Sequence, residues 1–192
     1  DKNRLQDAER LISKYPGSSP DLVFQQGALA FLKKDYSLAQ KLFREAARRA
    51  SETTAENALF NENLAALNAN DASGAAALIK EAADSSRLRE SILFEQAHYA
   101  AKRMAPQAAE LLANFITLAE TPALKTQARL DQAEVALNLN PPDLETVQAI
   151  LPLLEKEQLS PEQTMQLARL NILEEESRQE WPRACLLYTS PS

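Results

Sequence analysis

Several residue types that carry chemistry or mark other fold classes are scarce in this sequence. Its 192 residues include one cysteine, one histidine, one tryptophan and three glycines. One cysteine cannot close a disulfide within the chain. A transition-metal site would have to be built from carboxylates alone, and none are clustered at ligand spacing. Few glycines and few β-branched residues leave little of the usual material of β-sheets.

Longer features are missing as well. No apolar run approaches the roughly 18 residues that a membrane span requires. The opening stretch DKNRLQDAERLISKY is charged and amphipathic, unlike a signal peptide, which leaves the compartment open. The net charge is −6 and acids alternate with bases, so no basic face accumulates for nucleic acid. There is no glycine-rich phosphate loop and no nucleophile elbow.

What is present favours helices that repeat at a constant interval. Alanine, leucine, glutamine, glutamate, lysine and arginine dominate, all good helix formers. Four nine-residue segments align without gaps, and a fainter fifth follows 35 residues after the fourth. They are VFQQGALAF from Val23, LFNENLAAL from Leu59, LFEQAHYAA from Leu93, RLDQAEVAL from Arg129 and TMQLARLNI from Thr164. The second place is large and apolar. The fifth is mostly small, which lets a neighbouring helix approach closely.

A second amphipathic helix is predicted after each of the first four segments. Apolar residues recur there with a helical period, within 36–50, 73–85, 106–120 and 144–157. Pro152 should kink the last of these or end it early. Three N-caps followed by proline and two capping boxes punctuate the chain. The caps are Ser19-Pro20, Thr121-Pro122 and Ser160-Pro161, and the boxes pair Thr53 with Glu56 and Ser160 with Gln163. The sequence thus predicts about ten helices of 12 to 18 residues joined by short turns.

The first full repeat resembles the tetratricopeptide-repeat family of 34-residue helix–turn–helix units. The match is carried by Gly27, Asp35-Tyr36, Ala39, Phe43 and Ala46. The resemblance weakens along the chain. The second repeat keeps Asp71, Ala75 and Ala82 but has Asn63 in place of glycine, and the third keeps Ala97 and Ala109. The fourth has two extra residues around Pro141-Pro142 and lacks the signature alanine.

This resemblance implies an all-α solenoid whose repeats stack into a right-handed superhelix. The array would span 1–182. Its units would be about 1–19 (partial), 20–52, 53–85, 86–120, 121–158 and 159–178 (partial). In this family the first helices line a concave groove that takes peptides or helices of partners. Carried onto this chain, the groove positions include Asp21, Phe24, Phe31, Asn57, Phe60, Asn68, His98, Lys102, Gln127, Glu134 and Asn138.

Two interpretations of these positions stay open. The amides of Asn57, Asn68 and Asn138 could clamp a ligand backbone or simply face water. The phenylalanines could anchor a ligand, although packing between helices is favoured. For His98, a catalytic base needs a nucleophile or an orienting carboxylate, and the sequence offers only Glu95 nearby on the same helix. We expect no catalytic residue, metal or cofactor.

The sequence therefore favours a non-catalytic scaffold that binds a partner protein or peptide. One alternative is the helical regulatory or targeting part of a larger enzyme. Another is a structural spacer that self-associates through a terminal repeat, because repeat ends expose apolar faces.

The last eight residues, CLLYTSPS at 185–192, depart from the helical period before them. They resemble the translated end of a transposon-based sequencing adaptor. We therefore expect a non-native tail on a bacterial fragment whose own sequence leads up to Ala184 without a cysteine. The stretch KYPGSSPD resembles turns of bacterial envelope tetratricopeptide proteins, which favours the periplasm or envelope over the cytoplasm, where such features also occur.

Overall fold

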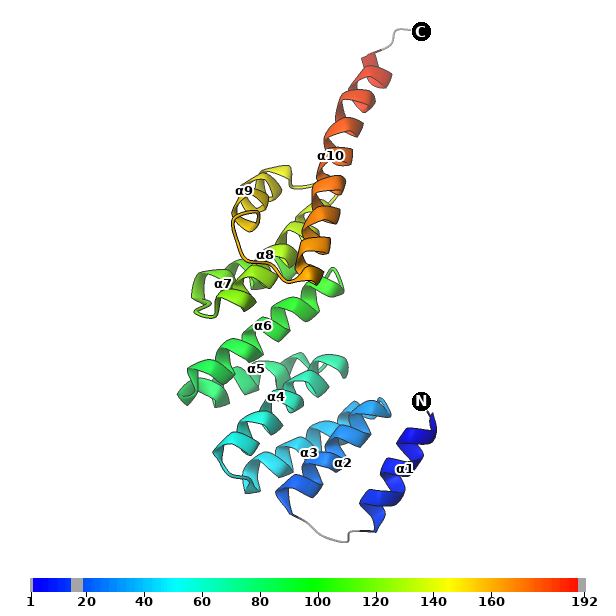
Figure 1. Cartoon of the computed structure of the whole chain (residues 1–192), viewed down its shortest axis with the longest axis vertical. Helices are drawn as coiled ribbons and strands as arrows, with labels where there is room; N and C mark the ends of the chain where they lie inside the picture. Colours follow the sequence, from blue (N-terminus) through cyan, green and yellow to red (C-terminus); the bar gives the residue numbers. More distant parts are fainter. Residues whose placement is uncertain (1, 15–18, 190–192) are drawn as a thin grey trace. The chain divides into compact units, whose positions relative to one another are not determined.

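The computed structural model describes residues 2–14 and 19–189, with side chains for all of these except 2–4, 13, 52 and 179–189. Every regular element in this part of the chain is a helix, which confirms the all-α class (Figure 1). The helices are α1 (Lys2–Ser13), α2 (Pro20–Leu32), α3 (Tyr36–Arg49), α4 (Glu52–Asn68), α5 (Ala72–Glu81), the 3-10 helix η1 (Ala82–Asp84), α6 (Ser86–Lys102), α7 (Ala108–Leu118), α8 (Pro122–Leu137), α9 (Leu144–Leu154) and α10 (Pro161–Thr189). The five aligned segments lie on α2, α4, α6, α8 and α10, the first helices of their repeats.

The same turn joins the first helix to the second in three successive repeats. The second residue after each first helix adopts a left-handed conformation, with φ of 65° at Lys34, 57° at Asn70 and 49° at Met104. The next backbone N–H donates at 2.9 Å to a carbonyl five residues back, on Ala30, Ala66 and Ala100. This is the Schellman arrangement, which satisfies carbonyls that a helix end leaves unpaired. All three alanines hold the eighth place of their segment and are buried.

Aspartates begin three of the second helices. Asp35, Asp71 and Asp143 each accept a hydrogen bond from the backbone N–H three residues later, at 3.1, 2.9 and 3.1 Å. The link before Asp143 is longer, yet the Asp143 N–H still donates to the carbonyl of Ala136, the eighth-place residue of that segment. Such caps satisfy backbone donors that the helix itself leaves free.

The fifth place of each segment is a close-packing position in four of the five first helices. Gly27, Asn63, Ala97 and Ala133 are all buried. A Cβ on Gly27 would lie 2.9 Å from the Phe43 ring, so only glycine fits there without a shift. Ala168, in the fifth copy, is exposed. The prediction of a small buried residue therefore holds for α2, α4, α6 and α8, but not for α10.

The chain divides into two compact units, Asp1–Glu95 and Gln96–Ser192, with the division inside α6. In the first unit each first helix packs on its second helix, α2 on α3 and α4 on α5. In addition α4 packs on α3, and α2 lies against α4. The buried side chains that fill these contacts include Val23, Ala39, Phe43, Ala46 and Leu78.

The second unit repeats that scheme. Helix α8 packs on α9, α7 packs on α8, and α10 packs on both α8 and α9. Its core is formed by Leu130, Ala133, Ala136, Leu137, Val147, Ile150, Leu151, Leu154, Leu167 and Leu170. In both units, first helices of successive repeats are thus in contact, and a second helix packs on the first helix that follows it.

Several details differ from the sequence predictions. Helix α4 begins after Ser51, so Thr53 and Glu56 lie inside it and form no capping box, whereas the box of Ser160 and Gln163 is present. Ala109 is exposed and its neighbour Ala108 is buried, because the turn after Met104 delays the start of α7. Helix lengths range from 10 residues in α5 to 29 in α10, wider than predicted.

Of two further predictions about helix ends, one is confirmed and one is wrong. Pro152 lies two residues before the end of α9, in agreement with an early stop. Helix α10 continues through 185–189, where a break in the helical period was expected. The origin of that tail stays a prediction, and the side chain of Cys185 lies outside the described residues.

Candidate interaction surface

The predicted groove residues of the first unit fall into two groups. Phe24 and Phe31 are half-buried against their own second helix, with ring centroids 5.3 Å from Phe43 and 5.3 Å from Tyr36, respectively. Phe60 packs against the cluster of Leu78, Ala82, Leu88 and Ile92. These aromatic side chains belong to the packing between helices, as the sequence favoured. Asp21 and Asn57 are exposed.

Two of the three predicted asparagines already use their side-chain amide nitrogens within their own helices. The amide nitrogens of Asn68 and Asn138 each donate to the backbone carbonyl four residues earlier, Leu64 and Glu134, at 2.8 Å. A clamp on a ligand backbone would have to break these bonds or use the amide oxygens alone. The clamp therefore stays a prediction for which Asn57 is the better placed of the three.

In the second unit, predicted positions from two helices meet at one buried carboxylate. Asp131 on α8 is only 1% exposed. Its Oδ2 lies 2.5 Å from His98 Nδ1 of α6, and its Oδ1 accepts from Gln127 Nε2 at 3.2 Å. Lys102 Nζ, also on α6, lies 4.0 Å from Oδ1. A buried carboxylate needs such partners, since its desolvation is otherwise costly.

Sequence reasoning missed Asp131 and the partner it gives to His98. The orienting carboxylate comes from the next repeat rather than from Glu95. The signal was present: Asp131 occupies the third place of its segment and His98 the sixth place of the preceding one. Two first helices that lie side by side bring these places together. The carboxylate fixes the ring of His98, while Gln127 shares the same acceptor.

A second carboxylate on α8 lies between two exposed cations. Glu134 Oε2 is 3.7 Å from Lys102 Nζ, and Glu134 Oε1 is 3.4 Å from Arg169 Nη1 of α10. The Lys102 and Arg169 side chains are 51% and 66% exposed. Ion pairs this exposed contribute at most about 1 kcal/mol. These two charges are therefore available to a partner at little cost to the fold.

Glutamines complete the polar surface between α8 and α10. Gln166 Nε2 donates to Glu134 Oε2 at 3.3 Å, again from the sixth place of one segment to the third place of the next. Gln127 donates to Gln166 and accepts from Gln163, at 3.1 and 3.3 Å. We call this connected set the α8 polar network. It consists of His98, Lys102, Gln127, Asp131, Glu134, Gln163, Gln166 and Arg169.

Hollows near the network are of two sizes. One of about 60 Å³ is lined by Ala101, Lys102, Met104, Asp131, Glu134 and Val135. Ligand pockets usually measure about 300–1,000 Å³, so a small molecule does not fit there. A wider cleft of about 630 Å³ lies where the α7–α8 and α9–α10 links meet the start of α8. Four charged residues line it, Glu120, Lys125, Arg129 and Glu157, and the last two are paired with each other.

The first unit carries its charged cluster on other helices. Arg44 of α3 donates through Nε to Glu62 of α4 at 3.0 Å and also pairs with Glu81 of α5. Burial raises the pKa of Glu62 above its ordinary value, although Arg44 opposes this shift. For Arg44 burial acts to lower the pKa, but the bonds and charges of Glu81 and Glu62 outweigh it, so its pKa is raised. This cluster joins second helices to a first helix, and none of its members is a predicted groove residue.

No protein-family model, curated protein or solved structure matches the chain. In the described part of the chain, no helix has both the length and the apolar character needed to cross a membrane. Among the same residues, histidine, cysteine, aspartate and glutamate form no group of three that could hold a metal ion. Function must therefore be argued from the surface itself.

Proposed function

We propose that this chain is a non-catalytic interaction scaffold, built as a tetratricopeptide-like array, that holds a segment of a partner protein on its first helices. The working surface that we favour is the α8 polar network. One observation carries the proposal: His98, Lys102, Gln127 and Glu134, four positions that the family resemblance assigns to a groove, belong to one connected surface on α6 and α8.

The arrangement of the helices supports this proposal. Each unit brings successive first helices into contact, so their outward places form a continuous surface rather than separate patches. The buried carboxylate of Asp131 and the shared glutamine bonds hold the polar side chains in place before any partner arrives. Preorganised side chains lose less conformational entropy on binding, which favours affinity.

The exposed cations provide the means to test the surface without unfolding it. A peptide library displayed on phage is selected against the intact chain, and the affinity of recovered peptides is then measured by titration. Lys102→Glu and Arg169→Glu should weaken these peptides about tenfold or more, because each reverses a charge at the centre of the surface. Two exposed lysines outside the network serve as matched controls, Lys80→Glu on α5 and Lys156→Glu after α9.

The outcomes separate clearly. Loss of binding with the network variants and retention with the control variants, at unchanged helicity by circular dichroism, supports the proposal. Selection that yields no binding peptide argues against it. Peptides that bind all four variants equally well would place the working surface elsewhere on the chain.

A further inference from the structure

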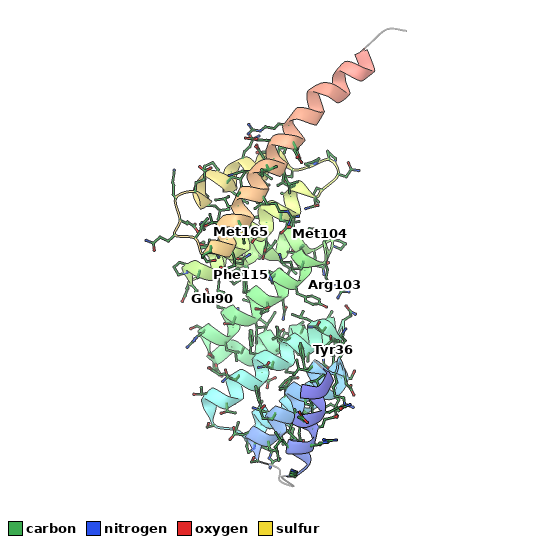
Figure 2. The ribbon with its side chains drawn as sticks, turned by 45° about the vertical axis from the view of Figure 1, so that its right-hand side comes forward. Tyr36, Glu90, Arg103, Met104, Phe115 and Met165 are labelled. Carbon is green, nitrogen blue, oxygen red and sulfur yellow. The ribbon has the colours of Figure 1, made fainter. Side chains whose placement is uncertain are left out.

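Helix α10 leaves exposed the face that the other first helices bury fully or in part. The relevant places in the segment are the second, fifth and ninth. On α8 these are Leu130, Ala133 and Leu137, which are 0%, 0% and 8% exposed. On α10 they are Met165 and Ile172, which are 69% and 58% exposed, and the exposed Ala168 between them. Met165 is labelled in Figure 2.

In the repeats that begin with α2, α4 and α8, the repeat's own second helix or the turn after it contacts these places. Phe24 and Gly27 of α2 meet the Phe43 ring of α3, and Phe31 meets Tyr36. On α8 the same places join a core to which α9 contributes Val147, Ile150, Leu151 and Leu154. On α6, Phe94, Ala97 and Ala101 are also buried. The second and ninth places are therefore apolar, and the fifth is mostly small, where a second helix packs on them.

The rest of α10 is packed in the same way as the preceding first helices. Leu167 and Leu170, at the fourth and seventh places, are 8% and 1% exposed and belong to the core of the second unit. Helix α10 thus docks on α8 and α9 through one face, and its open face lies on another side. Met165, Ala168 and Ile172 are spaced i, i+3 and i+7, which places them on one stripe.

We infer that the open face of α10, formed by Met165, Ala168 and Ile172, binds an amphipathic helix of a partner polypeptide. The partner helix lies antiparallel to α10, as each second helix lies on its first helix. It carries the pattern of helix α3, a bulky apolar residue between two small ones, as Phe43 lies between Ala39 and Ala46. This surface uses other side chains than the α8 polar network, so the inference is independent of the proposed function.

Charge decides between a partner helix and a second copy of α10. Glu175 and Glu176 are exposed and follow the stripe at its C-terminal end. An antiparallel helix would begin there, and its N-terminal dipole favours nearby carboxylates. In an antiparallel pair of α10 helices crossing at Ala168, Glu162 of each copy would approach Glu174 to Glu176 of the other. Like charges would then face one another, which disfavours self-association.

The probe is a synthetic peptide with the sequence of α3, YSLAQKLFREAARR, acetylated, amidated and labelled for fluorescence anisotropy. It has no acidic residue in its first turn and carries the required apolar stripe. The intact chain should bind it saturably. Met165→Glu and Ile172→Glu should each weaken binding about tenfold or more, because each places a charge in an apolar contact. Leu118→Glu, at an apolar residue 63% exposed on α7, should leave it unchanged.

Two further measurements complete the test. A second peptide has glutamate in place of the phenylalanine of the probe. It should bind the intact chain no more tightly than the original probe binds the Ile172→Glu variant. Glu175→Gln with Glu176→Gln should weaken the probe severalfold at low salt and less at high salt. The two apolar substitutions are at exposed positions, so folding can be checked separately for each by circular dichroism.

Three results would overturn the inference. The first is an intact chain that does not bind the probe saturably. The second is equal binding by the Met165→Glu, Ile172→Glu and Leu118→Glu variants. The third is sedimentation of the intact chain as a dimer that Ile172→Glu converts to monomer, which would assign the face to a second copy.

Discussion

The two units use the same hairpins but join their successive first helices differently. In the first unit the sixth place of each segment is apolar, with Ala28 and Leu64. In the second unit it is polar, with His98, Glu134 and Arg169. His98 and Glu134 bond to the next first helix, and Arg169 pairs with Glu134 of the preceding one. The first unit instead has a partly buried ion pair between α3 and α4, formed by Arg44 and Glu62. One place in a repeated segment thus decides whether the surface of adjacent first helices is apolar or polar.

In this repeated fold, the positions that stabilise each repeat differ from those that are available for binding. The turn recurs because its backbone hydrogen bonds satisfy carbonyls at the helix end, and the eighth-place alanine recurs at a position that is buried in α2, α4, α6 and α8. The sixth place faces away from that turn and is free to vary, so it can distinguish one repeat from another. In the first unit the side chains of Arg44 and Glu62 are only 27% and 11% exposed, and their pair stabilises the packing of α3 on α4. In the second unit Lys102 and Arg169 are 51% and 66% exposed and are available for binding.

The largest expected effect comes from the ion pair of the first unit. Arg44→Gln should lower the free energy of unfolding by about 2–3 kcal/mol, because it leaves the carboxylate of Glu62 enclosed without its cation. Glu62→Gln should cost less at neutral pH, since it removes the enclosed charge itself. The free energies of unfolding of the two variants are compared by denaturant titration at pH 7, monitored by far-ultraviolet circular dichroism. Equal costs for both would show that the pair, and not the burial of Glu62, determines the effect.

The pH dependence of the same pair has a definite sign. The pKa of Glu62 is raised in the folded chain because burial disfavours its charged form. Its contribution to stability is therefore fully present below the ordinary glutamate value of 4.5 and is lost as the pH rises through the folded pKa. The free energy of unfolding should therefore fall less between pH 4.5 and pH 7 in Glu62→Gln than in the parent chain. An unchanged pH profile would contradict this interpretation.

A smaller effect is expected from the carboxylate that organises the second unit. Asp131→Ala should cost about 1–3 kcal/mol, because His98 and Gln127 lose an acceptor that water does not readily replace in a buried position. Asn61 holds the same third place in the second repeat and donates to the carbonyl of its own Asn57 at 2.8 Å. Asn61→Ala should therefore cost about 0.5 kcal/mol or less. Thermal unfolding of both variants measures this contrast between the units.

Equal losses for Asp131→Ala and Asn61→Ala would show that the third place of the segment contributes equally to stability in the two units. A second readout is the imidazole of His98, whose nitrogen chemical shifts should change when the Asp131 contact is removed. If those shifts stay the same while stability falls, Asp131 stabilises α8 without orienting His98.

Much of the fold was predictable because its determinants are local. Helix positions, the period, the caps at Ser19 and Ser160 and the early stop at Pro152 follow from neighbouring residues. One prediction failed after Met104: helix α7 begins two residues later than the corresponding second helices α3 and α5, and the buried alanine is Ala108 rather than Ala109. The pairing of Asp131 with His98 depends on which first helices lie side by side. That information lies in the packing and not in either segment alone.

The smallest effects are expected at the caps, where the two units should behave alike. Asp71 and Asp143 begin second helices in the first and second unit, and the pKa of each is lowered. The backbone N–H of Gly74 is the main cause at Asp71, and the hydroxyl of Thr146 is the main cause at Asp143. Replacing either aspartate with alanine should cost about 1 kcal/mol at neutral pH.

The pH dependence of these caps tests that equivalence. A lowered pKa means that the stabilisation is present above the ordinary aspartate value of 3.8 and is lost as the pH falls through the folded pKa. The difference between the parent chain and each variant should therefore shrink in acid, while Asp84→Ala, at an exposed residue outside these caps, should change little at any pH. A cost confined to one of the two caps would show that the two capped turns, which differ in length, also differ in their contribution to stability. In that case the difference between the two units would include the hairpin turns as well as the sixth place.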